Sequence, residues 1–302
     1  MDHAQFGMRA RPFRPGPDPT AYFPAAPHEE VLAALRQAMA ADEPFAVLTG
    51  EPGVGKTLLA QVLLERVGDE AITAVITNSH FETRTALLQA LLYDLGLTYE
   101  HKSEQELRLA LTDCLMTRMK EDRRTLIIID EAHHLSADCL EELRLLANLE
   151  ARQCRGMQVI LLGLPELIET LQRPELRALA QRITTRVCLG RLDADESAEY
   201  IRSQIRAAGQ LADEVFSDEA IELLAKSAQG LPRILNQTAR HALQLTCQSG
   251  GDQVDAEAVL EALALIGVEP PAEEKPESPG DAIDAFRLGM IDTHRLASTA
   301  NR

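Results

Sequence analysis

Tryptophan is absent from the 302-residue sequence, and aromatic residues together make up only 4% of it. Aromatic rings usually supply a large share of a buried core. Hydrophobic residues still account for 45% of the chain, so leucine and alanine must fill the interior. Both residues form helices readily, and the composition therefore indicates a globular protein rich in helix.

Positive charge is scarce as well, because 30 lysines and arginines face 47 aspartates and glutamates, which gives a net charge of −17. Nonspecific coating of duplex DNA and peripheral binding to anionic membranes both need clustered positive charge. The overall charge argues against both functions, although it is compatible with a local basic surface.

Cysteine pairs and long apolar runs are missing too. The five cysteines are odd in number and never form a C-x-x-C pair, so neither a disulfide framework nor a zinc site is indicated. No apolar run approaches the roughly 18 residues of a membrane helix, and the first nineteen residues contain no apolar segment of the signal-peptide type. We therefore expect a soluble, cytoplasmic protein with reduced thiols and no membrane span.

The chain is longer than an average domain and divides by composition. Residues 1–28 contain six prolines, too many for a helix or a central strand, and predict an extended arm on the surface. Residues 268–302 are rich in proline and glutamate at their start and predict an acidic linker and tail without fixed structure.

Between these ends, short apolar runs at 45–49, 72–77, 126–129 and 157–162 alternate with segments of helical periodicity. One such helix begins with a capping-box pattern at Ser103 and Glu106. Buried strands that alternate with helices predict a parallel, doubly wound α/β sheet over residues 29–192.

From residue 193 to residue 267 only amphipathic helices are predicted, at 195–208, 217–228, 232–248 and 255–266. Gly209 and Gly230 stand where helices would stop. We expect a small, all-helical second domain here.

The segment after the first apolar run matches the phosphate-binding pattern G-x-x-x-x-G-K-[ST] in full, with a predicted strand before it and a predicted helix after it. Its backbone N–H groups would point at phosphate oxygens, Lys56 would reach the β and γ phosphates, and the Thr57 hydroxyl would bind Mg²⁺. The predicted ATP contacts are Gly50, Glu51, Pro52, Gly53, Val54, Gly55, Lys56, Thr57 and Leu58. The alternative is a glycine-rich loop with a solvated lysine.

A second motif supports nucleotide hydrolysis, because the apolar run 126–129 ends in Asp130 and Glu131. Asp130 is predicted to hold Mg²⁺ with Thr57, and Glu131 to polarise the attacking water. His133 and His134 complete the string DEAHH, which invites a helicase interpretation that a chain of this length does not favour. We interpret both histidines as loop or cap residues, since no set of metal-ligand partners is visible for His134.

From about residue 6 to residue 266 the chain resembles AAA+ ATPases, specifically the ExeA-like general-secretion and transposition-regulator branch, which is grouped with origin-recognition-like domains. The strings that carry the resemblance, besides the two motifs above, are RPF, PDPTAYFP, EELRLLANLE, LLGLPEL, LAQRITTR and GLPRILNQ.

The resemblance implies roles for further residues. Asn78 would orient Glu131, although a turn asparagine is the alternative. Arg182, or else Arg186, would be an arginine finger that acts on the ATP of a neighbouring subunit. Arg233 would sense the γ phosphate from the start of a helix in the second domain.

Two departures from the branch are visible. Leu164 occupies a position that is commonly polar and could act as a sensor, so hydrolysis could be slow unless another polar group, such as Asn148, takes that role. The membrane span and peptidoglycan-binding region of the secretion members are not found in this sequence, which weakens a direct role at the cell envelope.

The leading hypothesis is an ATP-hydrolysing molecular switch or assembly ATPase that forms a homo-oligomer and acts on a protein partner not identified by the sequence. The first alternative is an ATP-dependent DNA-binding regulator of the transposition type, favoured by local arginines at 173, 177, 182, 186 and 191. The second is a scaffold that binds ATP but barely hydrolyses it. A small-molecule kinase fits the motifs less well.

Overall fold

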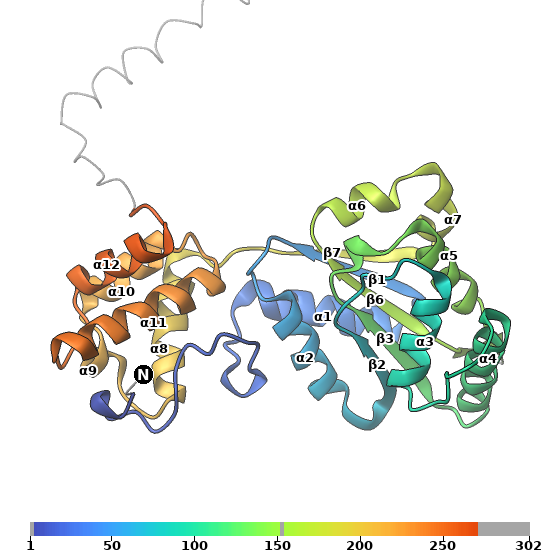
Figure 1. The fold of residues 1–302 in the computed structure, drawn as a ribbon, viewed down its shortest axis with the longest axis horizontal. Helices are drawn as coiled ribbons and strands as arrows, with labels where there is room; N and C mark the ends of the chain where they lie inside the picture. The colour runs from blue at the N-terminus through green and yellow to red at the C-terminus, as the bar shows by residue number, and fades with distance from the viewer. Residues whose placement is uncertain (1–2, 152–153, 271–302) are drawn as a thin grey trace, which may run out of the picture. The chain divides into compact units, whose positions relative to one another are not determined.

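Five strands form a fully parallel sheet in the order β2-β3-β6-β1-β7 in this computed structural model, which describes residues 3–151 and 154–270 (Figure 1). The strands are β1 (Phe45–Gly50), β2 (Ala71–Ile76), β3 (Arg124–Ile129), β6 (Gln158–Gly163) and β7 (Ile183–Leu189). A separate antiparallel pair consists of β4 (Glu150–Ala151) and β5 (Cys154–Arg155). Because the strands of the main sheet are parallel, they all end at one edge, which we call the carboxyl edge.

Helices cover both faces of this sheet (Figure 1). They are α1 (Ala26–Ala40), α2 (Lys56–Val67), α3 (Arg84–Asp94), α4 (Glu104–Lys120), α5 (Ala137–Leu146), α6 (Glu166–Leu171) and α7 (Arg177–Ala180). Successive residues of β1 enter opposite cores: Phe45 and Val47 pack with α3, α4 and α5, whereas Ala46 and Leu48 pack with α1 and α2. The predicted doubly wound α/β fold is confirmed.

The strand β7 was not among the predicted apolar runs. Its burial alternates, with Ile183 and Leu189 buried and Arg186 exposed, because β7 is an edge strand with one side open to solvent. An alternating edge strand lacks the continuous apolar run by which the central strands were recognised. The predicted capping box is present, with the Ser103 hydroxyl oxygen and the Glu106 carboxylate each accepting the other's main-chain N–H.

Beyond β7 the described chain is helical. The helices are α8 (Ala194–Ala207), α9 (Ala212–Val215), α10 (Asp218–Ser227), α11 (Pro232–Ser249) and α12 (Ala256–Ile266). They share a hydrophobic core of their own, as predicted, although the single turn α9 was not expected. The domain limits at residues 28, 192 and 267 stay predictions, and the tail from residue 271 onward lies outside the described residues.

The proline-rich arm is anchored more deeply than predicted. Phe13 is fully buried in the core of the helical segment, where its ring lies edge-on to Phe216 at a centroid distance of 6.2 Å. The arm also donates the Arg9 N–H to the Ala208 carbonyl at 2.8 Å. Helix α1 begins at Ala26, and Pro27 occupies a first-turn position where its missing N–H costs nothing.

Short 3-10 turns occur at His3–Phe6, Pro19–Ala21, Gly68–Glu70, Ala132–His134 and Pro174–Leu176. In the part of the chain that the structure describes, no helix has the length and apolarity needed to cross a membrane.

Candidate active site

The predicted phosphate-binding loop connects β1 to α2 at the carboxyl edge of the sheet, where parallel α/β sheets place their ligands. Gly53 and Gly55 have φ values of +90° and +111°, a backbone region that L side chains rarely adopt. A Cβ atom at Gly55 would also lie 3.2 Å from the Nε2 atom of His28. The glycines therefore serve both the turn and its close packing.

Lys56 is the first residue of α2 and is buried. Its ammonium group donates hydrogen bonds to the carbonyl oxygens of Gly50, at 2.8 Å, and Glu51, at 3.0 Å. Burial lowers the pKa of Lys56, while the nearby carboxylates of Glu131 and Asp130 act in the opposite direction. The lysine is thus held over the loop beside two acidic groups.

Thr57 and Asp130 meet across the site, although 73 positions separate them in the sequence. The Thr57 hydroxyl donates to the Asp130 Oδ2 atom at 2.5 Å, and the other oxygen of this buried carboxylate accepts the Glu131 N–H at 2.8 Å. Adjacent ligands of an octahedral Mg²⁺ ion lie about 2.9 Å apart, and Mg²⁺ prefers oxygen ligands. The Thr57 hydroxyl oxygen and the Asp130 Oδ2 atom would become two such ligands if the distance between them grew by about 0.4 Å.

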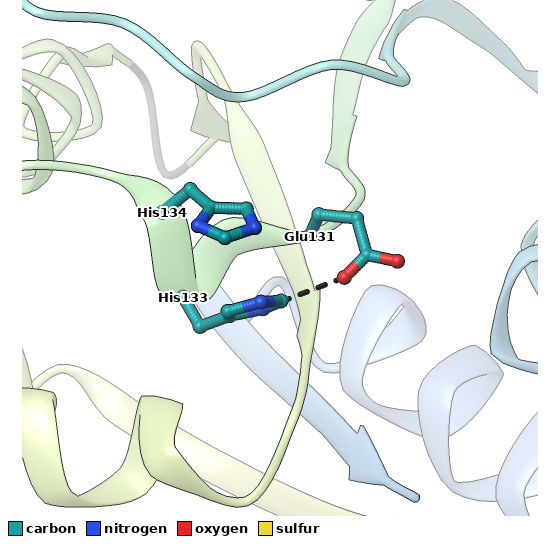
Figure 2. Close-up of side chains that lie close together, drawn as sticks. All are labelled: Glu131, His133 and His134. Atoms are coloured by element: carbon teal, nitrogen blue, oxygen red, sulfur yellow. Dashed lines mark ion pairs between the residues drawn. The ribbon is translucent and has the colours of Figure 1, made fainter. Parts of the chain in front are cut away.

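Glu131 has a left-handed backbone, with a φ of +51°, which is uncommon for a residue other than glycine. Its carbonyl oxygen accepts hydrogen bonds from the Ser79 hydroxyl at 2.6 Å and the His134 N–H at 3.0 Å. The side chain is 48% exposed, and its Oε2 atom lies 3.5 Å from the Nδ1 atom of His133 (Figure 2). Strained backbone held by surrounding hydrogen bonds is a common feature of functional sites.

His133 is more than the loop or cap residue that the sequence suggested. Its Nδ1 atom also lies 3.4 Å from the main-chain nitrogen of Leu164, whose N–H can donate to it. Burial lowers the pKa of His133, and the neighbouring His134 adds to this effect. A polar imidazole therefore stands beside Leu164, the position where the sequence lacks a polar side chain.

Arg233 lies at the start of α11, and its N–H donates to the Gly53 carbonyl at 3.3 Å. A Cβ atom at Gly53 would lie only 2.9 Å from the Cβ atom of Arg233, so the loop glycine also makes room for this helix. The positive charge of Arg233 contributes to lowering the pKa of Lys56. The two cations therefore act in one electrostatic environment.

A pocket of about 480 Å³ lies at this site. Its walls include Pro52, Gly53, Gly55, Lys56, Thr57, Leu58, Glu131, Leu164, Arg233 and, from the arm, Arg11 and Arg14. The contribution of the arm was missed because a proline-rich segment carries no phosphate-binding pattern. A pocket of this size suits a nucleotide-sized ligand.

Glu51 points away from the phosphate loop toward the chain that follows β7. Its carboxylate forms an ion pair with Arg191, which holds the pKa of Glu51 below its usual range. Arg191 also donates to the side-chain oxygen of Gln229 at 3.3 Å. The phosphate loop is thereby connected to the turn that precedes α11.

Other predicted residues lie elsewhere. The Asn78 side chain accepts the His80 N–H at 3.2 Å, and it is the neighbouring Ser79 that contacts Glu131. The orienting role of Asn78 stays a prediction.

Asn148 follows the far end of α5, next to Leu149, whose carbonyl accepts the N–H of Gly156 ahead of β6. It therefore lies at the opposite edge of the sheet from Leu164 and cannot replace its missing polar group.

Arg182 precedes Ile183, which pairs with Phe45 at the start of β1. The phosphate loop follows the other end of β1, roughly 16 Å farther along at about 3.3 Å per residue. Arg182 thus lies away from the phosphate loop of its own chain. Arg186 pairs with Val47 farther along β1, and its side chain donates to the Ala180 carbonyl at 3.1 Å.

A phosphate loop at the carboxyl edge, a Thr57–Asp130 pair and the parallel strand order β2-β3-β6-β1-β7 give this chain the P-loop fold of AAA+ proteins. Residues 39–171 match the family model described as "AAA domain". Nucleotide binding is therefore expected.

The chain is 34% identical over 250 residues to General secretion pathway protein A of Aeromonas hydrophila, an alignment that covers 82% of this chain but 45% of that protein. It is 27% identical over 259 residues to ATP-dependent target DNA activator B of Escherichia phage Mu, which covers 84% of this chain and 76% of the phage protein. The resemblance predicted from the sequence is confirmed.

Solved structures show the same fold at low sequence identity. The ORC2 protein of Aeropyrum pernix, in a structure of its ADPNP–ADP complexes, has a TM-score of 0.65 at 16% identity and covers 78% of this chain, with 66% of its own chain aligned. Cdc6p of Pyrobaculum aerophilum has a TM-score of 0.66 at 17% identity, over 82% of this chain and 71% of its own.

Proposed function

We propose that this protein binds ATP with Mg²⁺, hydrolyses it to ADP and phosphate, and acts as an oligomeric molecular switch or assembly ATPase. The observation that carries the proposal is that Lys56, Thr57 and Glu131 line one pocket, with Asp130 hydrogen-bonded to Thr57 beside it. Each is of the residue type that phosphoryl transfer to water requires.

In this proposal Lys56 binds the β and γ phosphates, and the loop N–H groups hold their oxygens. Thr57 and Asp130 hold Mg²⁺, which when bound neutralises phosphate charge. The Glu131 carboxylate accepts a proton from the water that attacks the γ phosphorus, while the bond between that phosphorus and the β-γ bridging oxygen breaks and ADP leaves. Arg233, from the start of α11, contacts the γ phosphate and couples the helical segment to nucleotide state.

Leu164 does not prevent hydrolysis in this scheme, because a polar group is supplied from a neighbouring position. The Nδ1 atom of His133 lies beside both the Leu164 N–H and the Glu131 carboxylate. With a proton on Nδ1 it can donate to that carboxylate or its water, and without that proton it accepts the Leu164 N–H instead. The sensing function that the resemblance implies for a side chain after β6 would then belong to His133.

ATP turnover by the Glu131→Gln variant tests the proposal. Loss of the proton acceptor should reduce kcat by about 10²- to 10⁴-fold while ATP still binds, and light scattering in ATP should show a larger species than the wild type. Lys56→Ala is the matched control, because it should lose ATP binding itself. Wild-type protein that binds ATP but neither hydrolyses it nor assembles would instead support the scaffold alternative.

A second candidate function is ATP-dependent DNA binding, favoured by the similarity to ATP-dependent target DNA activator B over 76% of that phage protein. Arg173, Arg177 and Arg186 are exposed along the segment from α6 to β7 and offer a local basic surface. Fluorescence anisotropy with a labelled duplex should show binding that needs ATP and weakens steeply with salt. Absence of binding at low salt with ATP would eliminate this candidate.

A further inference from the structure

The turn that follows Asp130 brings three metal-ligating side chains together. Glu131, His133 and His134 each offer a ligand atom, and these three atoms lie within 4.8 Å of one another (Figure 2). Glu131 and His134 are exposed to solvent, and His133 is partly buried. A small ion could therefore reach them directly.

The spacing is close to that of a tetrahedral metal site. Nitrogen and carboxylate ligands lie about 2.0–2.2 Å from Zn²⁺, which puts two ligand atoms about 3.4 Å apart. The Nδ1 atom of His133 and the Oε2 atom of Glu131 are already 3.5 Å apart. A metal ion at this nitrogen would take the place of its hydrogen bond from the Leu164 N–H, which is long at 3.4 Å. The His134 ring has to approach by about 1.4 Å at most, which an exposed side chain can do by rotation.

The backbone under these side chains is fixed. The Glu131 N–H is bound by Asp130 and its carbonyl by the Ser79 hydroxyl, while His133 and His134 lie in the 3-10 turn Ala132–His134. Ligands on a rigid turn lose little freedom when they bind an ion. His80 adds a third imidazole nearby, with its ring centroid 5.4 Å from that of His134.

We propose that Glu131, His133 and His134 form a binding site for a divalent transition-metal ion of the Zn²⁺ class, separate from the Mg²⁺ ligands Thr57 and Asp130. Two imidazole nitrogens and one carboxylate suit Zn²⁺, Co²⁺ or Ni²⁺, whereas Mg²⁺ prefers the all-oxygen pair. Three protein ligands leave a fourth position for water or for His80.

Occupation of this site would inhibit ATP hydrolysis, a consequence that rests on the proposed function. Glu131 is the proposed proton acceptor, and a carboxylate bound to a cation is a much weaker base. The ion would therefore act as an inhibitor controlled by transition-metal availability, with ATP binding at Lys56 and Thr57 left intact.

Cobalt titration of the full-length protein, without a polyhistidine tag, tests the site itself. We expect the visible absorption bands of tetrahedral Co²⁺ at a one-to-one ratio, and their loss when Zn²⁺ is added. His134→Ala should weaken Co²⁺ binding by at least about tenfold, the lower range of the loss seen even for outer-shell partners of metal sites. His241→Ala, a histidine on α11, is the matched control and should bind as the wild type does.

Equal binding by the wild type and His134→Ala, or an equal loss in His241→Ala, would overturn the site. Circular dichroism of each variant distinguishes a lost ligand from a lost fold. His133→Asn provides a second variant, which should also weaken Co²⁺ binding by at least about tenfold.

Inhibition is measured separately, as the Zn²⁺ concentration that halves each variant's own Mg²⁺-ATP turnover. This concentration should rise at least about tenfold in His134→Ala, in parallel with the loss of affinity. Tetrahedral Co²⁺ binding without inhibition would keep the site and overturn its regulatory role. If the protein proves not to hydrolyse ATP, the cobalt titration still tests the metal site by itself.

Discussion

His28 lies against the phosphate loop and holds it by a hydrogen bond to Val54. Its Nε2–H donates to the Val54 carbonyl at 3.2 Å, and its Nδ1 atom is buried without a hydrogen-bond partner among the residues that the structure describes. Burial lowers the pKa of His28 below its ordinary value of 6.5, because a second proton would place an unsolvated charge beside the loop.

We predict that His28 makes the folded state less stable in mild acid. Below pH 6.5 the unfolded chain binds a proton at His28 that the folded chain does not, so stability falls as pH drops from 6.5 toward the lowered pKa. Urea unfolding at pH 7.5 and 5.5 should show a smaller pH effect for His28→Gln than for the wild type. His241→Gln should keep the wild-type pH effect, and an unchanged effect in His28→Gln would contradict the prediction.

The motif residues of the site could be predicted from the sequence, because their chemistry depends on a short local pattern. Lys56 and Thr57 lie within one loop, and Asp130 with Glu131 ends one strand. Ser79, His28 and His133 could not be predicted in the same way. Their roles depend on which elements meet at the carboxyl edge, and an isolated serine or histidine carries no signal of that meeting.

At the scale of elements, the turn before α11 depends on one glycine. Gly230 has a φ of +72°, and a Cβ atom there would lie 2.0 Å from the Leu192 carbonyl oxygen. The Leu192 N–H also donates to the Gly230 carbonyl at 3.0 Å. This glycine was predicted as a helix stop, but its main effect is to let the chain entering α8 pack against the turn that leads to Arg233.

Gly230→Ala is therefore predicted to destabilise the folded state by more than the cost of the left-handed backbone alone. The left-handed conformation alone should cost about 1–2 kcal/mol, and the clash with Leu192 should add about 1–3 kcal/mol. Gly250→Ala is the matched control, because Gly250 has a φ of +75° with nothing within 4 Å of its Cβ position. Chemical unfolding should separate the two variants, and equal losses would show that the clash relaxes without cost.

The elements themselves were predictable where the apolar pattern is continuous or periodic. The central strands, the edge strand β2 and the long amphipathic helices have such patterns, and they occur within a few residues of their predicted positions. The edge strand β7 and the single turn α9 have weaker patterns, and both were missed. The arm was predicted as a surface feature because its prolines exclude regular structure, and no local pattern shows that Phe6, Met8 and Phe13 are buried in the helical core.

At the scale of the whole molecule, the parallel sheet separates the phosphate loop from Arg182. Because the two lie toward opposite ends of neighbouring strands, Arg182 can assist hydrolysis only at the site of another copy of the chain. The proposed oligomer is thus a requirement of the proposed mechanism.

Mixing inactive variants tests this requirement. Arg182→Ala should lower turnover by about 10³-fold or more, and Glu131→Gln should be inactive for a different reason. In a mixed oligomer about one quarter of the interfaces would combine an intact Glu131 with an intact Arg182, so turnover should recover well above either variant alone. Recovery with Arg186→Ala in place of Arg182→Ala would identify Arg186 as the finger, and no recovery in either mixture would exclude an arginine acting between subunits.

The position of β1 in the sheet has a practical consequence for dissecting this protein. The family match spans residues 39–171, but β1 lies between β6 and β7, and β7 begins at Ile183. A fragment cut to the matched segment would lack β7, so the strand that carries the phosphate loop would become an edge strand with one side unpaired. An exposed strand edge of this kind favours aggregation. It would also lose most of α1 and the arm, so the recognisable portion of the sequence is not a transplantable nucleotide-binding module.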